Sequence, residues 1–291
     1  MWQVSRHEIP VTQDVALKRA QTIASDAESF LDIVEQRTST LRSVFSDALM
    51  AARYWCVVDP EAARIETWDQ FVLAMQASCG VFVAAARPGE VIPMRLGRVV
   101  KQVTGNGPNV YTGAGSWLTT LWLSLVCRER DRTRFLANVP LDVLRGSGER
   151  EADYVYPVYS WVEALQLYWR QDPQMFDRLL EAMQGTNPEG LEPADASLVA
   201  RVLFPPMKLF YYFTQRDAAA FNDALVEALE LHREYWTATE ERVRDSDGFI
   251  ALAPLALACL ARDAGMPIEV TSEYLPRYLL EGSWVGEYPT D

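Results

Sequence analysis

The stretch Phe213-Thr214-Gln215-Arg216-Asp217-Ala218-Ala219-Ala220-Phe221 indicates how this chain folds, because it joins one apolar helical pattern to the next through a short polar turn. Asp217 is placed to cap the second helix. The apolar residues of that helix recur at offsets of three and four, at Phe221, Ala224, Leu225 and Ala228. This spacing draws one apolar stripe along a helix. Two amphipathic helices joined by a capped turn form an antiparallel helical pair.

Similar helix endings occur at four places in the chain. They are Cys127-Arg128-Glu129-Arg130-Asp131, Trp169-Arg170-Gln171-Asp172, Phe213-Thr214-Gln215-Arg216-Asp217 and Leu260-Ala261-Arg262-Asp263. The Asp residues of these endings are separated by 41, 45 and 46 residues. A spacing in the forties is typical of stacked helical pairs. The sequence therefore predicts an all-α fold of stacked antiparallel helical pairs.

Apolar residues recur at helical spacing through most of the chain. The predicted helices cover residues 11–22, 24–56, 62–86, 116–130, 155–170, 173–184, 194–215, 218–244, 248–262 and 272–280. One segment differs: residues 91–103 contain short β-branched stretches that end at a glycine-rich turn, which predicts a small β-hairpin. We expect a single α-helical domain over residues 1–291, with an N-terminal helical subregion at 1–86 and the helical stack at 114–291.

Charge and composition limit the class of partner. The chain has 40 Asp and Glu against 27 Lys and Arg, a net charge of −13, which is the wrong sign for binding nucleic acid or anionic lipid. The N-terminus has no basic segment followed by an apolar run, so secretion is not expected. The uncharged residues 70–86 contain Gln76 and Ser78, which favours a buried helix over a membrane span. Cys56, Cys79, Cys127 and Cys259 lie in apolar sequence without CxxC spacing, as reduced thiols of a cytoplasmic protein would.

Residues that carry catalysis or bind metal are scarce. The chain has two histidines, and we expect neither His7, near the N-terminus, nor His232, on a charged helix, to have a companion. No HExxH motif, cysteine pair, nucleophile elbow or phosphate-binding loop is present. The sequence therefore predicts no catalytic residue, no metal site and no cofactor.

Two segments combine acidic with aromatic side chains. Aromatic anchors inside a charged rim are typical of protein interfaces. The candidate partner-binding residues are Glu149, Glu151, Asp153, Tyr154, Tyr156 and Tyr159 in the first segment, and Tyr235, Trp236, Glu240, Glu241, Asp245 and Asp247 in the second. The alternative is that the aromatic side chains belong to the core and the acids form an ordinary solvated rim.

Several segments of the chain resemble the Immunity protein 49 family of bacterial polymorphic toxin systems. They are Cys56-Val57-Val58-Asp59-Pro60-Glu61-Ala62-Ala63-Arg64-Ile65-Glu66-Thr67-Trp68, Gly115-Ser116-Trp117-Leu118-Thr119, Glu227-Ala228-Leu229-Glu230-Leu231-His232, Tyr235-Trp236-Thr237-Ala238, Pro254-Leu255-Ala256-Leu257-Ala258-Cys259-Leu260-Ala261 and Glu273-Tyr274-Leu275-Pro276. These segments are spread over most of the chain beyond residue 50, and none of them is a catalytic signature.

The resemblance implies a cytoplasmic, mostly helical protein that binds a cognate toxin and keeps it inactive, without enzyme activity or a cofactor. The expected partner is then a protein toxin, rather than nucleic acid or a membrane. The net charge of −13 permits a basic, nuclease-like toxin but does not require one. A second function remains open, because a helical stack could equally be an adaptor that binds a peptide or regulatory protein in its concave face.

Overall fold

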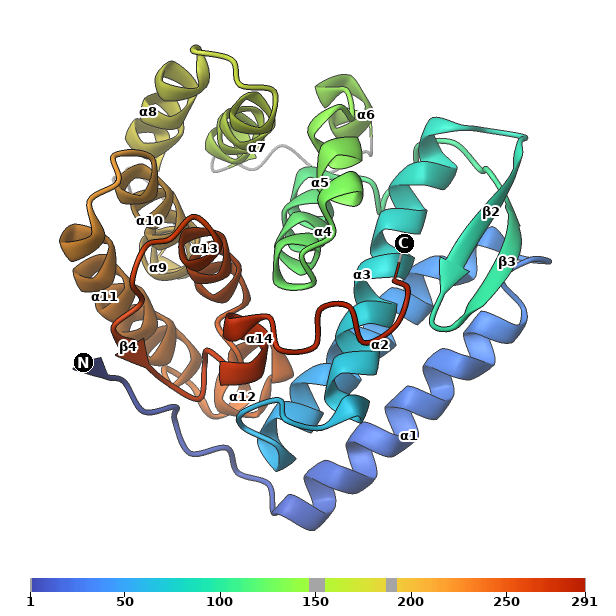
Figure 1. Ribbon diagram of the computed structural model, residues 1–291, viewed down its shortest axis with the longest axis horizontal. Coiled ribbons are helices and arrows are strands. Elements are labelled where there is room, and N and C mark those ends of the chain that lie inside the picture. The colour runs from blue at the N-terminus through green and yellow to red at the C-terminus, as the bar shows by residue number, and fades with distance from the viewer. Residues whose placement is uncertain (1, 147–154, 187–192, 291) are drawn as a thin grey trace.

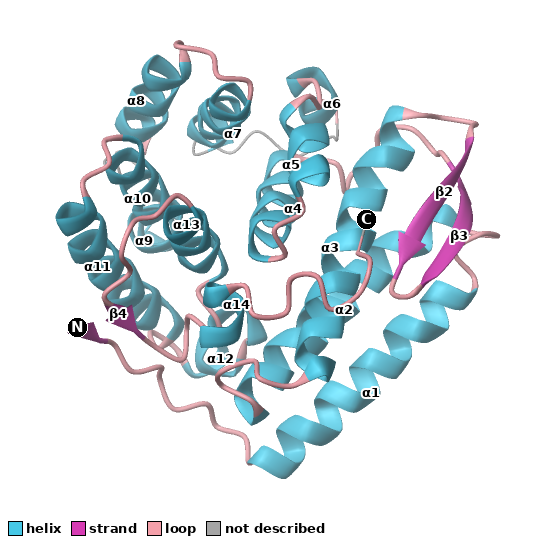
Figure 2. Cartoon of the chain, viewed as in Figure 1, coloured by secondary structure: helices cyan, strands magenta, loops and turns pink. Residues whose placement is uncertain are grey.

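The computed structural model describes residues 2–146, 155–186 and 193–290, and most of them are helical (Figure 1, Figure 2). Three long helices come first: α1 (Gln13–Asp32), α2 (Leu41–Val58) and α3 (Ile65–Ala86). α1 packs against α2, and α2 packs against α3. Figure 1 shows this group on one side of the molecule.

The break between the first two helices lies at residues 33–40, and the predicted break near residue 23 is wrong. α1 continues through an alanine-rich stretch because alanine has the highest helix propensity. α1 ends at Asp32, and the short 3-10 helix η1 (Thr38–Thr40) precedes α2. Thr38 Oγ1 donates to the Thr104 carbonyl at 2.5 Å, and Thr40 Oγ1 donates to the Arg37 carbonyl at 2.8 Å. Such side-chain bonds compete with helix formation.

The predicted hairpin is present as strands β2 (Val91–Leu96) and β3 (Val99–Thr104), which pair antiparallel. Its turn contains Gly97, with φ of 62°, a conformation that glycine adopts without steric cost. The Gly97 N–H donates to Gln76 Oε1 of α3 at 2.6 Å, so α3 holds the turn in place. The prediction of an all-α fold with a small hairpin is confirmed.

The remaining helices form the other side of the molecule. They are α4 (Ala114–Val126), α5 (Arg130–Ala137), α6 (Leu141–Arg145), α7 (Val155–Trp169), α8 (Met175–Gly185), α9 (Pro193–Leu198), α10 (Phe204–Thr214), α11 (Ala218–Trp236), α12 (Glu240–Arg244), α13 (Leu252–Asp263) and α14 (Arg277–Glu281). A π-helical segment, η2 (Val199–Leu203), joins α9 to α10. α4 and α13 pack against each other, and Figure 1 shows them between the α1–α3 group and the α7, α8, α10 and α11 group.

Three predicted boundaries in this half are wrong. The helix predicted at 116–130 ends at Val126, and the short helices α5 and α6 follow it. The helix predicted at 272–280 is helical only from Arg277, because Pro276 precedes its first turn and proline is favoured at helix starts. The helix predicted at 218–244 is interrupted between α11 and α12.

The four similar sequence endings form one kind of turn. Just beyond the end of each helix, one residue has a positive φ. These residues are Arg128 (60°), Gln171 (57°), Arg216 (56°) and Gly265 (86°). The next N–H donates to the carbonyl five residues earlier, as Asp217 does to Tyr212 at 3.1 Å. This is the Schellman pattern of helix termination. The ends of α4, α7, α10 and α13 are thus structurally equivalent.

At two of these turns, the residue whose N–H closes the turn is not the Asp residue that the sequence comparison aligned. The residue equivalent to Asp217 is Glu129 after α4, rather than Asp131. After α13 it is Met266, rather than Asp263. The backbone hydrogen bonds define the turn, and the nearby Asp residues have other partners at these two sites.

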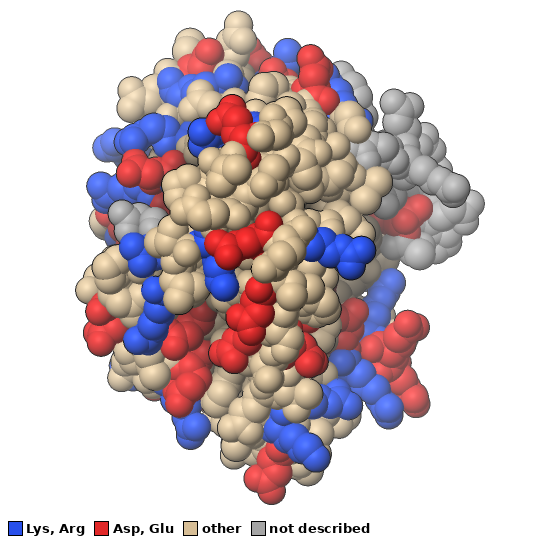
Figure 3. Space-filling view, turned by 90° about the vertical axis from the view of Figure 1, so that its right-hand side faces the viewer, with Lys and Arg blue, Asp and Glu red and all other residues tan. Residues whose placement is uncertain are grey.

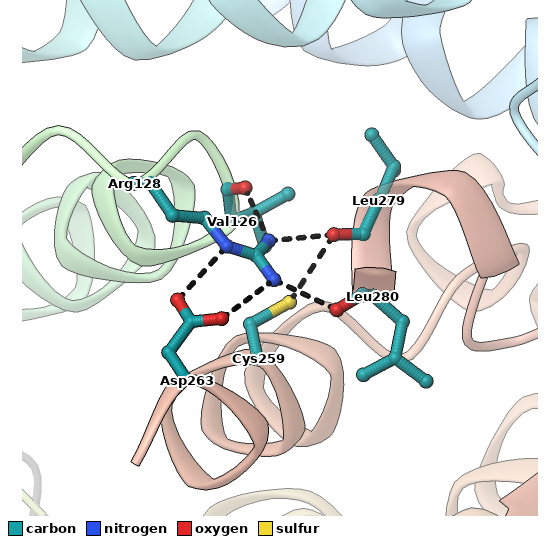
Figure 4. Close-up of polar contacts among 6 residues, drawn as sticks. All are labelled: Val126, Arg128, Cys259, Asp263, Leu279 and Leu280. Atoms are coloured by element: carbon teal, nitrogen blue, oxygen red, sulfur yellow. Dashed lines mark hydrogen bonds and ion pairs between the residues drawn. The ribbon is translucent and has the colours of Figure 1, made fainter. Parts of the chain in front are cut away.

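Arg128 ties the end of α4 to α13 and α14 (Figure 4). Its guanidinium donates to Asp263 Oδ2 at 3.0 Å and to the backbone carbonyls of Val126, Leu279 and Leu280. The Arg128 side chain is only 12% exposed. Asp263 therefore pairs with Arg128 instead of capping a following helix.

Both chain ends connect the two sides of the molecule. Strand β1 (Trp2–Gln3) pairs in parallel with β4 (Val270–Thr271), and the chain then runs to the start of α1 (Figure 1). At the other end, the Tyr288 hydroxyl donates to Asp69 Oδ1 of α3 at 2.6 Å. Gln76 Nε2 donates to the Thr290 carbonyl at 2.9 Å.

α3 is long and apolar enough to cross a membrane, by length and composition alone. In this structure 83% of an apolar 18-residue stretch of α3 is buried inside the protein, as predicted for residues 70–86. The four cysteines are buried free thiols, which also agrees with the sequence prediction.

Candidate functional site

The second acidic-aromatic segment forms a corner at the end of α11. We call residues 235–247 the α12 corner; it comprises the end of α11, α12 and the first residues of the short turn η3 (Ser246–Gly248). α11 ends at Trp236, and the Thr237 N–H and Oγ1 both donate back to the Arg233 carbonyl, at 3.0 and 2.8 Å. Thr239 then caps α12 by accepting the Arg242 N–H at 3.2 Å. Without this break the carboxylates that follow would continue along the α11 helix.

Four carboxylates of the α12 corner are exposed: Glu240, Glu241, Asp245 and Asp247. The first two lie in the first turn of α12, where the helix dipole stabilises negative charge. Asp245 accepts the Asp247 N–H at 3.0 Å, and Asp247 pairs with Arg53 of α2. Arg242 and Arg244 lie among these acids, so the corner is acidic in balance but carries both signs of charge.

The two aromatic side chains of the α12 corner are half-buried. The Arg242 guanidinium lies 4.0 Å from the centre of the Tyr235 ring. Trp236 packs against Gly248 so closely that a Cβ at that position would lie 2.6 Å from Trp236 Cγ. Gly248 therefore allows the Trp236 side chain to pack closely against η3.

The first acidic-aromatic segment lies largely outside the described residues. Glu149, Glu151, Asp153 and Tyr154 belong to that undescribed part, and Tyr156 lies in the first turn of α7. Tyr159 is half-buried, with its ring under the Arg145 guanidinium and its hydroxyl donating to the Leu144 carbonyl at 3.5 Å. Tyr159 thus packs against α6.

Residues of both α7 and the α12 corner line a cavity of about 310 Å³. Val158 and Trp161 of α7 line it, as do Trp236 and Asp247 of the corner. Arg53 of α2 also lines it, a residue that is absent from both acidic-aromatic segments. The one available signal was an arginine inside the apolar run Ala51-Ala52-Arg53-Tyr54-Trp55.

The expectation that the two histidines have no companions is wrong. His7 Nδ1 lies 2.7 Å from the Tyr274 hydroxyl, and the His232 ring centre lies 4.8 Å from that of Tyr274. Burial lowers the pKa of His7 and lowers the pKa of His232 to about 4. Sequence reasoning missed this cluster because its members are far apart in the chain.

Acidic and basic side chains are interspersed on the face that carries α1 and the hairpin (Figure 3). Uncharged side chains cover much of this face, and Val91, Val99 and Val100 of the hairpin are exposed. This face therefore shows no concentration of negative charge.

Within the described residues, no group of three or more His, Cys, Asp or Glu side chains could hold a metal ion. No curated protein and no solved structure matches the chain. The sequence pattern of the Immunity protein 49 family matches residues 59–279, which is most of the chain. The chain therefore belongs to the Immunity protein 49 family and has the role of an immunity protein.

Proposed function

We propose that this protein neutralises the cognate toxin of a bacterial polymorphic toxin system by binding it and covering its active site with the α12 corner. The first acidic-aromatic segment remains a second candidate for contact with the toxin. Family membership supports the immunity role and a toxin partner. The observation that carries the choice of surface is the set of exposed carboxylates beside the half-buried Tyr235 and Trp236.

Charge supports a basic toxin of the nuclease type. The protein has a net charge of −13, and the α12 corner has four acidic against two basic side chains. Carboxylates can occupy positions where a nuclease would hold phosphates. Complementary charge raises association rates by ~10- to 10³-fold at low salt.

Neutralising a lethal partner requires nanomolar binding, about −12 kcal/mol. An interface that buries on the order of 1,600 Å² provides this when a few aromatic anchors lie at its centre. Tyr235 and Trp236 are the described residues of the two segments best placed to serve as such anchors. The role proposed here is inhibition by contact in the cytoplasm, without catalysis by this chain.

The immunity role expects a toxin-like gene beside the gene of this protein, and the test is coexpression with that gene, combined with a binding measurement on the purified pair. We expect rescue of growth and a stable complex. The double variant Glu240→Lys and Glu241→Lys should slow association by at least ~10-fold at low salt. A control variant, Glu28→Lys and Asp32→Lys, changes the net charge equally at exposed positions in the C-terminal part of α1, which lies beside the hairpin and away from α12 (Figure 1).

If both double variants slow association equally, the contact surface is not the α12 corner. If the folded proteins form no complex and growth is not rescued, the adaptor function replaces toxin inhibition.

A further inference from the structure

The cavity beside the α12 corner combines a buried cation, a second buried donor and an apolar wall. It lies between α2, α4, α7, η2, α10, α11, η3 and α13, and its volume is about 310 Å³. This volume is at the lower end of the range for small-molecule sites. We propose that this cavity binds a small carboxylate with an aromatic or other apolar body.

Arg53 is a buried cation with incomplete pairing. Its side chain is 12% exposed, and among the described residues it forms an ion pair with Asp247, whose side chain is 54% exposed. The buried Arg53 Nε has no hydrogen-bond partner among the described residues. Burial lowers the pKa of Arg53, and the nearby Asp247 and Asp245 only partly oppose this effect. A buried guanidinium is normally satisfied by acceptors, so an additional acceptor would be stabilised here.

A second donor on the same cavity is also unsatisfied. The Trp236 Nε1–H is buried and has no partner in the part of the chain that the structure describes. An indole N–H can only donate. His232 Nε2 lies 3.1 Å from the Gly248 carbonyl and is hydrogen-bonded to it. It therefore accepts a hydrogen bond from neither donor. Both donor nitrogens expose less than 1 Å² in this structure, so a ligand acceptor would reach them once their side chains turn toward the cavity.

The remaining wall is apolar and aromatic. Trp122 and Trp161 have ring centres 6.2 Å apart, and Leu118 and Met207 also line the cavity. This wall favours a ligand with a flat apolar body. Since Asp247 already neutralises part of the Arg53 charge, a monoanionic carboxylate fits the charge balance better than a phosphate dianion.

The test uses indole-3-acetate as the probe and calorimetric titration of the purified free chain. Indole, which lacks the carboxylate, and acetate, which lacks the apolar body, are the comparison ligands. We expect indole-3-acetate to bind at least about tenfold more tightly than either. The measurement needs no toxin, so its outcome is independent of the proposed immunity function.

Variants assign the binding to the two donors. Trp236→Phe removes the indole N–H but keeps an aromatic ring. Arg53→Lys keeps the positive charge but removes the guanidinium Nε–H donor. Each should weaken indole-3-acetate by at least ~3-fold and leave indole nearly unchanged. Trp284→Phe is the matched control, because Trp284 Nε1 donates to the Ala62 carbonyl away from the cavity.

Thermal unfolding of each variant establishes that it is folded. The proposal is overturned if indole-3-acetate binds no better than indole, or if Trp236→Phe and Trp284→Phe bind it equally. In either case, the two buried donors do not form a ligand site.

Discussion

The strongest quantitative prediction concerns His232 and the dependence of stability on pH. His232 is buried, and its pKa in the folded protein is about 4 rather than 6.5. Burial is the main cause, and the positive charges of His7 and Arg53 add to it, while the hydrogen bond to the Gly248 carbonyl opposes it. The folded protein therefore keeps His232 neutral at a pH where the unfolded chain takes up a proton.

The sign and size of the effect follow from this difference. Between pH 6.5 and 4 the unfolded state binds more protons, so stability falls as the pH is lowered. Since one pKa unit corresponds to about 1.4 kcal/mol, a pKa lowered from 6.5 to about 4 corresponds to about 3 kcal/mol over the whole titration. About 2 kcal/mol of this is lost by pH 5.

The assay is urea unfolding of the protein and of its His232→Gln variant at pH 7.5 and pH 5. Glutamine is neutral at both values, and its amide can still donate to the Gly248 carbonyl. We expect the unfolding free energy of the native protein to fall by about 2 kcal/mol more than that of the variant. His7→Gln should show a change of the same sign, because burial also lowers the pKa of His7. Equal losses in the native protein and in His232→Gln would refute the reasoning.

Three further substitutions test the packing. Arg128→Leu leaves buried carbonyls without a donor and should lower the unfolding free energy by about 3–5 kcal/mol in urea unfolding; a loss below 1 kcal/mol would contradict the role given to Arg128. Gly248→Ala places a Cβ against the Trp236 ring and should lower stability by about 1–3 kcal/mol and change the near-ultraviolet circular dichroism, whereas an unchanged spectrum would count against this contact. Tyr288→Phe removes the hydrogen bond to Asp69 and should speed amide exchange in residues 282–290 more than in α13, unless the C-terminal residues are held mainly by other contacts.

Local patterns in the sequence predicted the helices and the hairpin well, because each depends on neighbouring residues. The stripe Phe221, Ala224, Leu225 and Ala228 is the buried face of α11. The break after α1 was harder to predict, since residues 33–37 contain no glycine or proline and the η1 segment that follows bonds the distant Thr104 carbonyl through Thr38. The equivalence of Glu129 with Asp217 was also hidden, because the backbone conformation defines it and residue type does not.

The candidate site was less predictable for the same physical reason. The sequence singled out Trp236 and Asp247, which lie close together along the chain. It gave no reason to join them to Arg53 of α2, although Asp247 is the ion-pair partner of Arg53. Pairing between residues so far apart arises only when the η3 turn is packed against α2.

Asp247 belongs to both proposed sites, and this makes them physically dependent. At the α12 corner it is an exposed carboxylate available to a basic toxin, and in the cavity it is the ion-pair partner of Arg53. A toxin cation that engages Asp247 would draw the carboxylate away from Arg53 and leave that guanidinium with less compensation. The cavity would then favour an anionic ligand more strongly. Because coupling between two binding sites is reciprocal, an occupied cavity would also strengthen toxin binding at the corner by the same factor.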